Sequence, residues 1–242
     1  IPASVKSIAS GVFQNCKMLT KAVVSEGITS IGTSAFSGSG FLSDLTLPVN
    51  SLTSIDGGAF NSTGLKSVTI PASVTSIGIN PFEGGSLQTI RVADGNKKFR
   101  AVNNMLVECK DSKLYKVISY PCNGGETATV PDQVEIIGDR AFIVSGVKNV
   151  KVSGAVKTIG NFAFSQSGLE MIDLPGSLLE IKDSAFYKAQ KLKAVDVPGR
   201  VTTIGQNCFS QCSALAEVIL GGDLISMGNS AFSQCTKITE IT

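Results

Sequence analysis

The sequence contains no histidine and no tryptophan, and only 6% of its residues are aromatic. The missing histidine excludes Ser–His–Asp and Cys–His nucleophilic systems, histidine general bases and histidine-based metal sites. A phosphate-binding loop is also missing, because the SGSG at residues 37–40 is not followed by Lys and then Ser or Thr. We therefore predict that the chain is not an enzyme and that it holds no cofactor and no metal.

The sequence also lacks a dominant charge and a long apolar run. Its 21 basic and 19 acidic residues give a net charge of +2, which argues against nucleic-acid binding driven by bulk charge. No run reaches the ~18–20 apolar residues that span a bilayer as a helix, so we expect no membrane insertion of this segment. The opening IPASVKSI resembles the interior of a repeat, and we interpret the chain as an excised or processed segment whose signal or anchor lies elsewhere.

The sequence does contain one motif that recurs along the chain, centred on an Ala-Phe step. The phenylalanines of this step are 23, 24, 22, 60, 22, 22, 23 and 23 residues apart, so the long gap equals one repeat of 22 plus an insertion of 38. This spacing predicts nine coils whose rings stack on one another. The nine phenylalanines are Phe13, Phe36, Phe60, Phe82, Phe142, Phe164, Phe186, Phe209 and Phe232.

Residues 65–86, LKSVTIPASVTSIGINPFEGGS, show the frame of one repeat. Val68 and Ile70 are two residues apart, which is the alternation of a β-strand. Pro71 follows directly and ends the strand, because it has no N–H for the next ladder bond. Each repeat is therefore predicted to start with a strand on one side of a coil.

The second half of the repeat predicts a short strand on the opposite side, followed by a bend. In the same unit Val74 and Ile77 point inwards and Gly78 follows. We expect a positive φ at this glycine column, although Asp56 and Lys182 occupy it in two coils. The other glycines of the column are Gly32, Gly138, Gly160, Gly205 and Gly228.

The full pattern, L-x-x-L-x-L-P-x-x-V-x-x-I-G-x-x-A-F-x-x-C, resembles the BspA-like leucine-rich repeats of bacterial surface proteins. The resemblance implies a mainly β, right-handed leucine-rich-repeat solenoid with a parallel concave sheet and short strands on the convex side. It assigns repeats 1–4 to residues 1–92 and repeats 5–9 to residues 131–242 of one continuous solenoid domain. The family cysteine is present only as Cys16, Cys212 and Cys235, so its position requires a small buried group rather than thiol chemistry.

Residues 93–130 interrupt the repeats, and we predict a β-hairpin or a three-stranded flap that returns to the solenoid at Val130. Two of the three tyrosines, Tyr115 and Tyr120, lie here. The insertion is either an exposed contact loop or a flap that packs its aromatic side chains on the solenoid, and the flap is favoured. Its residues Asn96, Phe99, Asn103 and Leu106, and the Tyr120–Pro121 step, are similar to inserts of the same family.

Six cysteines invite a disulfide or a zinc site. Cys212 and Cys235 are one repeat apart, and stacked coils about 4.8 Å apart place them within the range of a disulfide. Side chains in register point the same way, which favours free thiols that serve packing. A disulfide and a metal site remain the less favoured alternatives, since no zinc-type spacing recurs.

The outward residues of the predicted strands are the candidate binding surface. They are hydroxylated in the early coils and acidic in the later ones, and an acidic strip beside apolar residues suits a basic, partly apolar protein segment. The alternative is that mixed charges only keep the strands soluble. The candidate partner-binding residues are Arg91, Lys151, Met171, Asp173, Asp196, Glu217, Ile219 and, in the insertion, Tyr115.

These observations favour a non-enzymatic, cell-surface or secreted repeat module that binds a host or matrix protein, or adheres, through its concave face. The extracellular location and the adhesive role are implied by the family resemblance. The alternative is a carbohydrate- or matrix-binding module of a nutrient-capture system. A hydrolase with a carboxylate site at Glu108, Asp111 and Glu126 is the least favoured hypothesis.

Overall fold

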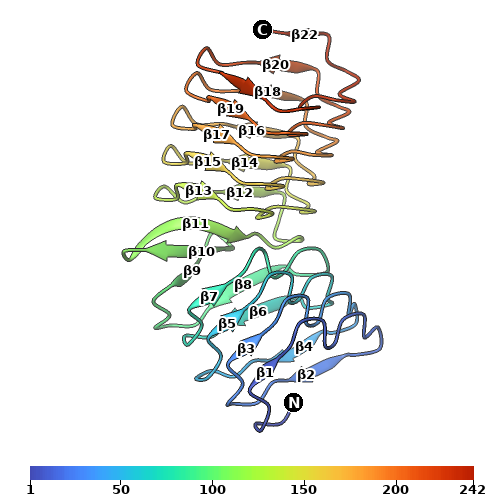
Figure 1. The fold of residues 1–242 in the computed structure, drawn as a ribbon, viewed down its shortest axis with the longest axis vertical. Helices are drawn as coiled ribbons and strands as arrows, with labels where there is room; N and C mark the ends of the chain where they lie inside the picture. The colour runs from blue at the N-terminus through green and yellow to red at the C-terminus, as the bar shows by residue number, and fades with distance from the viewer. The chain divides into compact units, whose positions relative to one another are not determined.

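The computed structural model describes residues 1–242, which form β-strands and turns and no helix (Figure 1). Accordingly, no helix is present that could cross a membrane. The chain divides into two compact units, which we call unit 1 (residues 1–113 and 119–124) and unit 2 (residues 114–118 and 125–242).

In unit 1 each repeat adds one strand to a front sheet and a shorter strand to a back sheet. The back strands pair in parallel in the order β1-β3-β5-β7, whereas the front strands pair only as β2-β4 and β6-β8. The front strands are β2 (Lys21–Val23), β4 (Asp44–Thr46), β6 (Ser67–Ile70) and β8 (Thr89–Val92). The back strands are β1 (Ser7–Ile8), β3 (Ser30–Ile31), β5 (Ser54–Ile55) and β7 (Ser76–Ile77).

Unit 2 repeats this arrangement. Its front strands pair in parallel as β12-β14-β16 and β18-β20-β22, and its back strands pair in parallel from β11 to β21. The front strands are β12 (Thr127–Thr129), β14 (Asn149–Lys151), β16 (Met171–Asp173), β18 (Ala194–Asp196), β20 (Glu217–Ile219) and β22 (Glu240–Ile241). The back strands are β11 (Lys113–Ser119), β13 (Ile136–Ile137), β15 (Thr158–Ile159), β17 (Glu180–Ile181), β19 (Thr203–Ile204) and β21 (Ser226–Met227).

The predicted fold class is therefore confirmed: the molecule is built from parallel β-solenoid coils with a strand on each side and a β-hairpin insertion. The strand alternation is as expected. In β16, for example, Ile172 is buried while Met171 and Asp173 are exposed. The assignment of residues 1–92, 93–130 and 131–242 to one continuous domain stays a prediction.

The phenylalanines of the Ala-Phe step stack in register within each unit. In unit 1 the ring centroids from Phe13 to Phe82 are 5.1, 5.4 and 5.8 Å apart. In unit 2 those from Phe142 to Phe232 are 4.9, 5.3, 4.9 and 5.1 Å apart. Backbone bonds follow the same spacing, since the Phe164 N–H donates to the carbonyl of Ala185 one coil on, at 2.7 Å. The predicted stacking of rings is confirmed inside each unit.

The prediction of positive φ at the glycine column is wrong. None of these glycines has a positive φ. They are required for space: a Cβ on Gly32 would lie 2.7 Å from the backbone nitrogen of Ser10, and one on Gly160 would lie 2.7 Å from that of Asp139. The column therefore marks a place where the backbones of consecutive coils approach closely.

Positive φ angles recur two residues before and two residues after the stacked phenylalanines, except before Phe82. Around Phe36 they are at Ser34 (55°) and Gly38 (74°), and around Phe164 they are at Phe162 (54°) and Gln166 (55°). Most of these positions are not glycine, which explains why the sequence did not reveal them. They turn the chain tightly on both sides of the ring.

The position three residues after the phenylalanine holds a small residue in every coil, and this residue is buried in six of the nine coils, whereas Cys16 and Cys235 are half-buried and Gly85 is exposed. The structure adds a reason. The hydroxyls of Ser145 and Ser167 donate to the carbonyls of the phenylalanines three residues earlier, both at 2.7 Å, and the Cys212 thiol donates to the Phe186 carbonyl at 3.1 Å. Serine, threonine and cysteine are interchangeable here because each supplies a small donor to a buried carbonyl.

The insertion forms the predicted strands β9 (Phe99–Val102), β10 (Met105–Lys110) and β11. β9 and β10 pair in antiparallel fashion around Asn103 and Asn104, which both have positive φ. Phe99 and Tyr120 are each only 2% exposed, so these two rings are packed rather than presented as a contact loop. The third strand was not foreseen as part of the solenoid, yet Lys116 of β11 pairs with Ile136 of β13 in the back sheet of unit 2.

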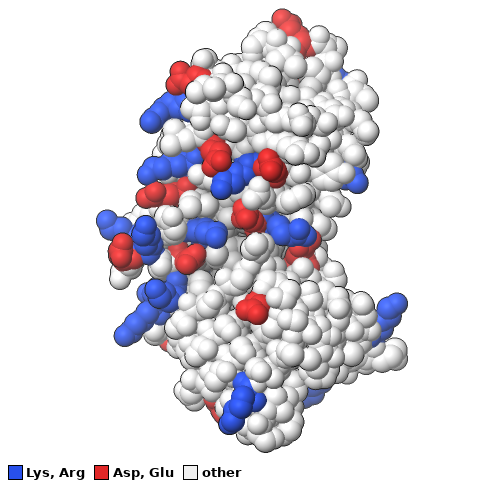
Figure 2. Space-filling model, in the orientation of Figure 1, with Lys and Arg blue, Asp and Glu red and all other residues white.

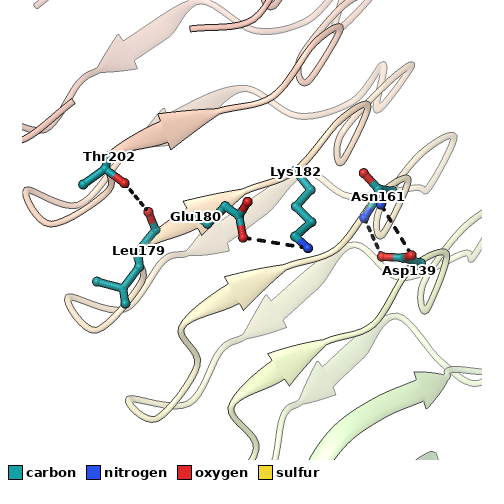
Figure 3. A network of polar contacts seen from close by, with 6 residues as sticks. All are labelled: Asp139, Asn161, Leu179, Glu180, Lys182 and Thr202. Atoms are coloured by element: carbon teal, nitrogen blue, oxygen red, sulfur yellow. Dashed lines mark hydrogen bonds and ion pairs between the residues drawn. The ribbon is translucent and has the colours of Figure 1, made fainter. Parts of the chain in front are cut away.

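Polar side chains join neighbouring coils along the back of unit 2 (Figure 3). The Asp139 carboxylate accepts from the backbone N–H of Asn161 at 2.8 Å and from its side-chain amide at 3.4 Å. The Thr202 hydroxyl donates to the Leu179 carbonyl at 3.4 Å. These contacts supply partners to backbone groups at the turns between strands.

Candidate protein-binding surface

The front sheet of unit 2 brings six of the predicted binding residues onto one face, which we call the unit 2 front face. It presents the outward residues of β14, β16, β18 and β20, and Met171 and Ile219 are 61% and 50% exposed. The predicted residues on it are Lys151, Met171, Asp173, Asp196, Glu217 and Ile219.

Strand register fixes the order of charges on this face. Lys151 is the register partner of Asp173, and Glu217 is the register partner of Glu240. None of the carboxylates of Asp173, Asp196, Glu217 and Glu240 forms an ion pair. The face is therefore an acidic strip with free carboxylates, bordered by one lysine.

A pocket of about 240 Å³ opens on this strip where strand pairing stops between β16 and β18. Asp173 and Asp196 stand on either side of it, and its remaining lining is apolar: Ile172, Leu174 and Pro198. A second depression of about 210 Å³ lies one coil earlier, between β14 and β16. Two carboxylates above apolar surface can hold a cationic head while its aliphatic stem covers the apolar residues.

Ion pairs at the start of the front strands were missed by the sequence analysis. Lys148 and Glu126 are 2.6 Å apart, and Lys193 and Glu170 are 3.1 Å apart. The Lys193 side chain, which donates a hydrogen bond to Glu170, lowers the pKa of that carboxyl, and the bond to Glu126 raises the pKa of Lys148. The signal that could have revealed these ion pairs is a lysine and a glutamate spaced one repeat apart.

Two predicted binding residues do not lie on the unit 2 front face. Tyr115 belongs to β11, a back strand, and is half-buried. Arg91 is exposed in β8, which belongs to unit 1, and its register partner is Thr69. The repeat spacing could not predict this difference in position. In the insertion it does not show which sheet β11 joins.

The remaining candidates for chemistry are structural. No three or more acidic, cysteine or histidine side chains are grouped to hold a metal ion. All six cysteines are free. Burial raises the pKa of Cys208, and a hydrogen bond with Cys235 together with burial raises that of Cys212, so both thiols stay protonated and are poor nucleophiles. Glu126 of the hypothetical hydrolase site is paired with Lys148.

Charged groups of both signs are interspersed on the face drawn in Figure 2, with wide uncharged areas between them. This agrees with the near-zero net charge of the chain. The acidic strip of unit 2 is thus a local feature rather than part of a global field.

These features define a leucine-rich-repeat protein: coils with paired front and back strands, regularly spaced inward leucines and other aliphatic residues, and a stacked ring in each coil. The chain matches the model of the BspA type leucine rich repeat region, in six copies, over residues 1–110 and 116–242, and it belongs to this family. No curated protein sequence matches the chain.

Solved structures support the same assignment. The chain is 31% identical to a leucine rich cell surface protein from Faecalibacterium prausnitzii, with a TM-score of 0.87, covering 96% of this chain and 62% of that one. It is 27% identical to the pneumococcal vaccine antigen PcpA, with a TM-score of 0.86, covering 100% and 66%. A leucine-rich repeat protein from Eubacterium ventriosum, at 22% identity and a TM-score of 0.67, shares the fold over 98% of this chain. The chain spans less than two thirds of the length of each of these structures.

Proposed function

We propose that the chain is a non-catalytic protein-binding module, and that the unit 2 front face binds a basic segment of a partner protein. The observation that carries this proposal is the pocket between β16 and β18, where Asp173 and Asp196 flank apolar surface and neither carboxylate has an ion-pair partner. An arginine or lysine of the partner fills the pocket, and Met171 beside it adds apolar contact.

We further propose that the module works at the cell surface or in the secreted state and serves adhesion. Support comes from membership of the BspA type family and from similarity to a structure described as a cell surface protein. Surface labelling of intact cells that produce the full-length protein tests this. Labelling equal to that of a known surface protein is expected, and labelling only after lysis would contradict the proposal.

The binding proposal is tested with Asp173→Asn/Asp196→Asn. Fluorescein-labelled peptides of eight residues, each with two or three lysines or arginines among leucine and valine, are titrated with the protein at two salt concentrations. Wild-type binding is expected to weaken as salt rises, and the double variant is expected to lose at least tenfold in affinity.

The matched control is Asp132→Asn/Asp223→Asn, which removes two exposed carboxylates outside the front strands. This control is expected to bind as the wild type does. Equal losses in both double variants would mean that only net charge attracts the peptides, and the proposed face would be abandoned. Saturable binding to a glycan array with no peptide binding would favour the carbohydrate-binding alternative.

A further inference from the structure

Unit 1 carries a second, different break in its front sheet. β2 pairs with β4 and β6 pairs with β8, but no pairing joins β4 to β6. The back strands of the same coils remain paired, with Ser54 in register with Ser76 and Ile55 with Ile77. The coils therefore stay joined at the back and open at the front.

The break coincides with changes in repeat length. The loop between Leu47 and Leu52 has four residues, whereas the corresponding loop between Ile70 and Val74 has three. The arc that leads from the stacked ring to the next front strand also differs in length. It has five residues between Phe36 and Leu42 and four between Phe60 and Leu65. The loop alone does not cause the break, because the first coil has three residues between Val24 and Ile28 and its strands still pair with those of the second coil. The break follows the change in the arc, whose length sets where the next front strand begins.

The opening is a pocket of about 510 Å³, a volume within the range of ligand-binding sites. Its apolar lining includes Leu45, Leu47 and Val68, and its polar lining includes Thr46, Ser67 and Thr69. No charged side chain and no aromatic ring lines it. The lining of this pocket is therefore uncharged, whereas that of the unit 2 pocket is acidic.

The main chain adds hydrogen-bonding capacity at this pocket. A parallel strand offers main-chain donors and acceptors on both of its edges. The outer edges of β4 and β6 are used by β2 and β8, whereas the two edges that face each other have no strand partner. Such edges bind extended peptides through main-chain hydrogen bonds, with side chains in neighbouring pockets.

We propose that the pocket between β4 and β6 binds an extended, uncharged peptide segment with a small aliphatic side chain. The peptide main chain bonds to the facing edges of β4 and β6 and to the hydroxyls around them, and the aliphatic side chain packs on Leu45, Leu47 and Val68. The absence of charge in the lining excludes ionic recognition here, so this site and the unit 2 front face select different partner segments.

The sequence supplies a matched pair of variants for the test. Residues 1–5 and 70–74 are the same pentapeptide, IPASV. Ala72 lines the pocket, whereas Ala3 does not, and both side chains are exposed. Ala72→Trp therefore fills the pocket, and Ala3→Trp makes the same change in the same sequence context away from it.

The probe is an array of acetylated, amidated eight-residue peptides made of Ala, Val, Leu, Pro, Ser, Thr, Gln and Gly. A subset is expected to bind the wild type independently of salt. Ala72→Trp should weaken this binding at least tenfold, while Ala3→Trp and Asp173→Asn/Asp196→Asn should leave it unchanged. Methylation of the peptide backbone nitrogens should abolish it.

Three results would overturn the proposal. They are the failure of every uncharged peptide to bind, equal binding by wild type and Ala72→Trp, and binding that survives backbone methylation. Neutral oligosaccharides that bind the wild type and are blocked by Ala72→Trp would assign the pocket to sugars instead. Equal urea midpoints of the two tryptophan variants show that both are folded.

Discussion

At the scale of single residues, the fold depends on what each position of the repeat contributes to the next coil. Phe164 is fully buried and contacts the rings of Phe142 and Phe186, while Asp173 is exposed. Phe164→Ala is expected to lower the free energy of unfolding by about 3–5 kcal/mol, and Asp173→Ala by less than about 0.5 kcal/mol. Urea unfolding measures both, and equal losses would show that the repeat register is wrong.

The glycine column gives a second residue-scale prediction. A Cβ on Gly205 would lie 2.5 Å from the carbonyl carbon of Lys182, whereas one on Gly176 would meet nothing within 4 Å. Gly205→Ala should therefore lower the free energy of unfolding by about 1–3 kcal/mol. The control Gly176→Ala should change it by less than about 0.5 kcal/mol. A neutral Gly205→Ala in the same urea experiment would refute the close approach of coils at this column.

A buried thiol predicts how stability depends on pH. Because burial raises the pKa of Cys208 above the ordinary value of 9.0, the contribution of this thiol to stability is complete below pH 9 and is lost as the pH rises further. The loss is about 1.4 kcal/mol per pH unit. Other coils place Ala at this position, so Cys208→Ala should fold normally.

The measurement is urea unfolding under reducing conditions at pH 8 and pH 10. Between these values Cys208→Ala is expected to lose about 1.4 kcal/mol less than the wild type. Titrations of lysine, tyrosine and the other cysteines affect both proteins and cancel in the comparison. Identical losses would show that the Cys208 thiol is not held protonated by the fold.

At the scale of elements, two amides attach the hairpin to the coils: Asn104 at its turn bonds to Gln88 and Ile90, and Asn96 before its first strand is buried. The Asn96 amide donates to the carbonyls of Pro71 and Val74 at 2.9 and 3.0 Å, and its oxygen accepts from the N–H groups of Lys98 and Phe99 at 2.9 and 2.8 Å. Asn96→Ala removes all four bonds. The Pro71 carbonyl keeps the Val74 N–H as a donor, but the other three groups lose their partner, which should cost about 1–3 kcal/mol.

The control is Asn123→Ala, since Asn123 is exposed and its side chain donates only to the Gly85 carbonyl, at 3.2 Å. It should change the free energy of unfolding by less than about 0.5 kcal/mol. Amide hydrogen exchange should accelerate in β9 and β10 of Asn96→Ala and remain slow in the control. Unchanged exchange in both would mean that the hairpin is held by other contacts.

The elements also show where sequence reasoning works. The front and back strands and the ring stacks follow from periodicity, because the same pattern recurs in coil after coil. The hairpin strands follow from local alternation and turn residues. Sheet breaks do not follow from periodicity. A one-residue difference, such as that between the arcs before β4 and β6, is invisible against normal repeat variation, yet it coincides with the break where a pocket opens. β11 was likewise interpreted as flap because its pairing with β13 leaves no local signal.

The sequence predicted only part of the candidate site, because periodicity gives the direction of side chains and not the breaks in a sheet. Alternation placed Asp173 and Asp196 outwards correctly, since it depends only on strand period. It could not reveal that strand pairing ends between them, nor that Tyr115 lies on the back sheet. Local patterns determine the direction of a side chain, whereas pockets depend on the spacing of whole coils.

At the scale of the whole molecule, the family and the repeats assign the chain to the BspA type leucine-rich repeat proteins. Their architecture separates the residues that form the core from the residues that form the front surface. The stacked rings and inward aliphatic residues are held constant from coil to coil, and the outward front residues vary without loss of the core. Two pockets of different character, an uncharged one in unit 1 and an acidic one in unit 2, therefore arise on coils of the same repeat pattern.

The central claim is that the phenylalanines of consecutive coils lie ring on ring. NMR of protein with labelled Phe rings measures this directly through ring-to-ring nuclear Overhauser effects. Cross-peaks are expected between rings one repeat apart, such as Phe164 with Phe186 and Phe186 with Phe209, where the centroids are 5.3 and 4.9 Å apart. Absence of these cross-peaks, or contacts that skip a coil, such as Phe164 with Phe209, would contradict the account.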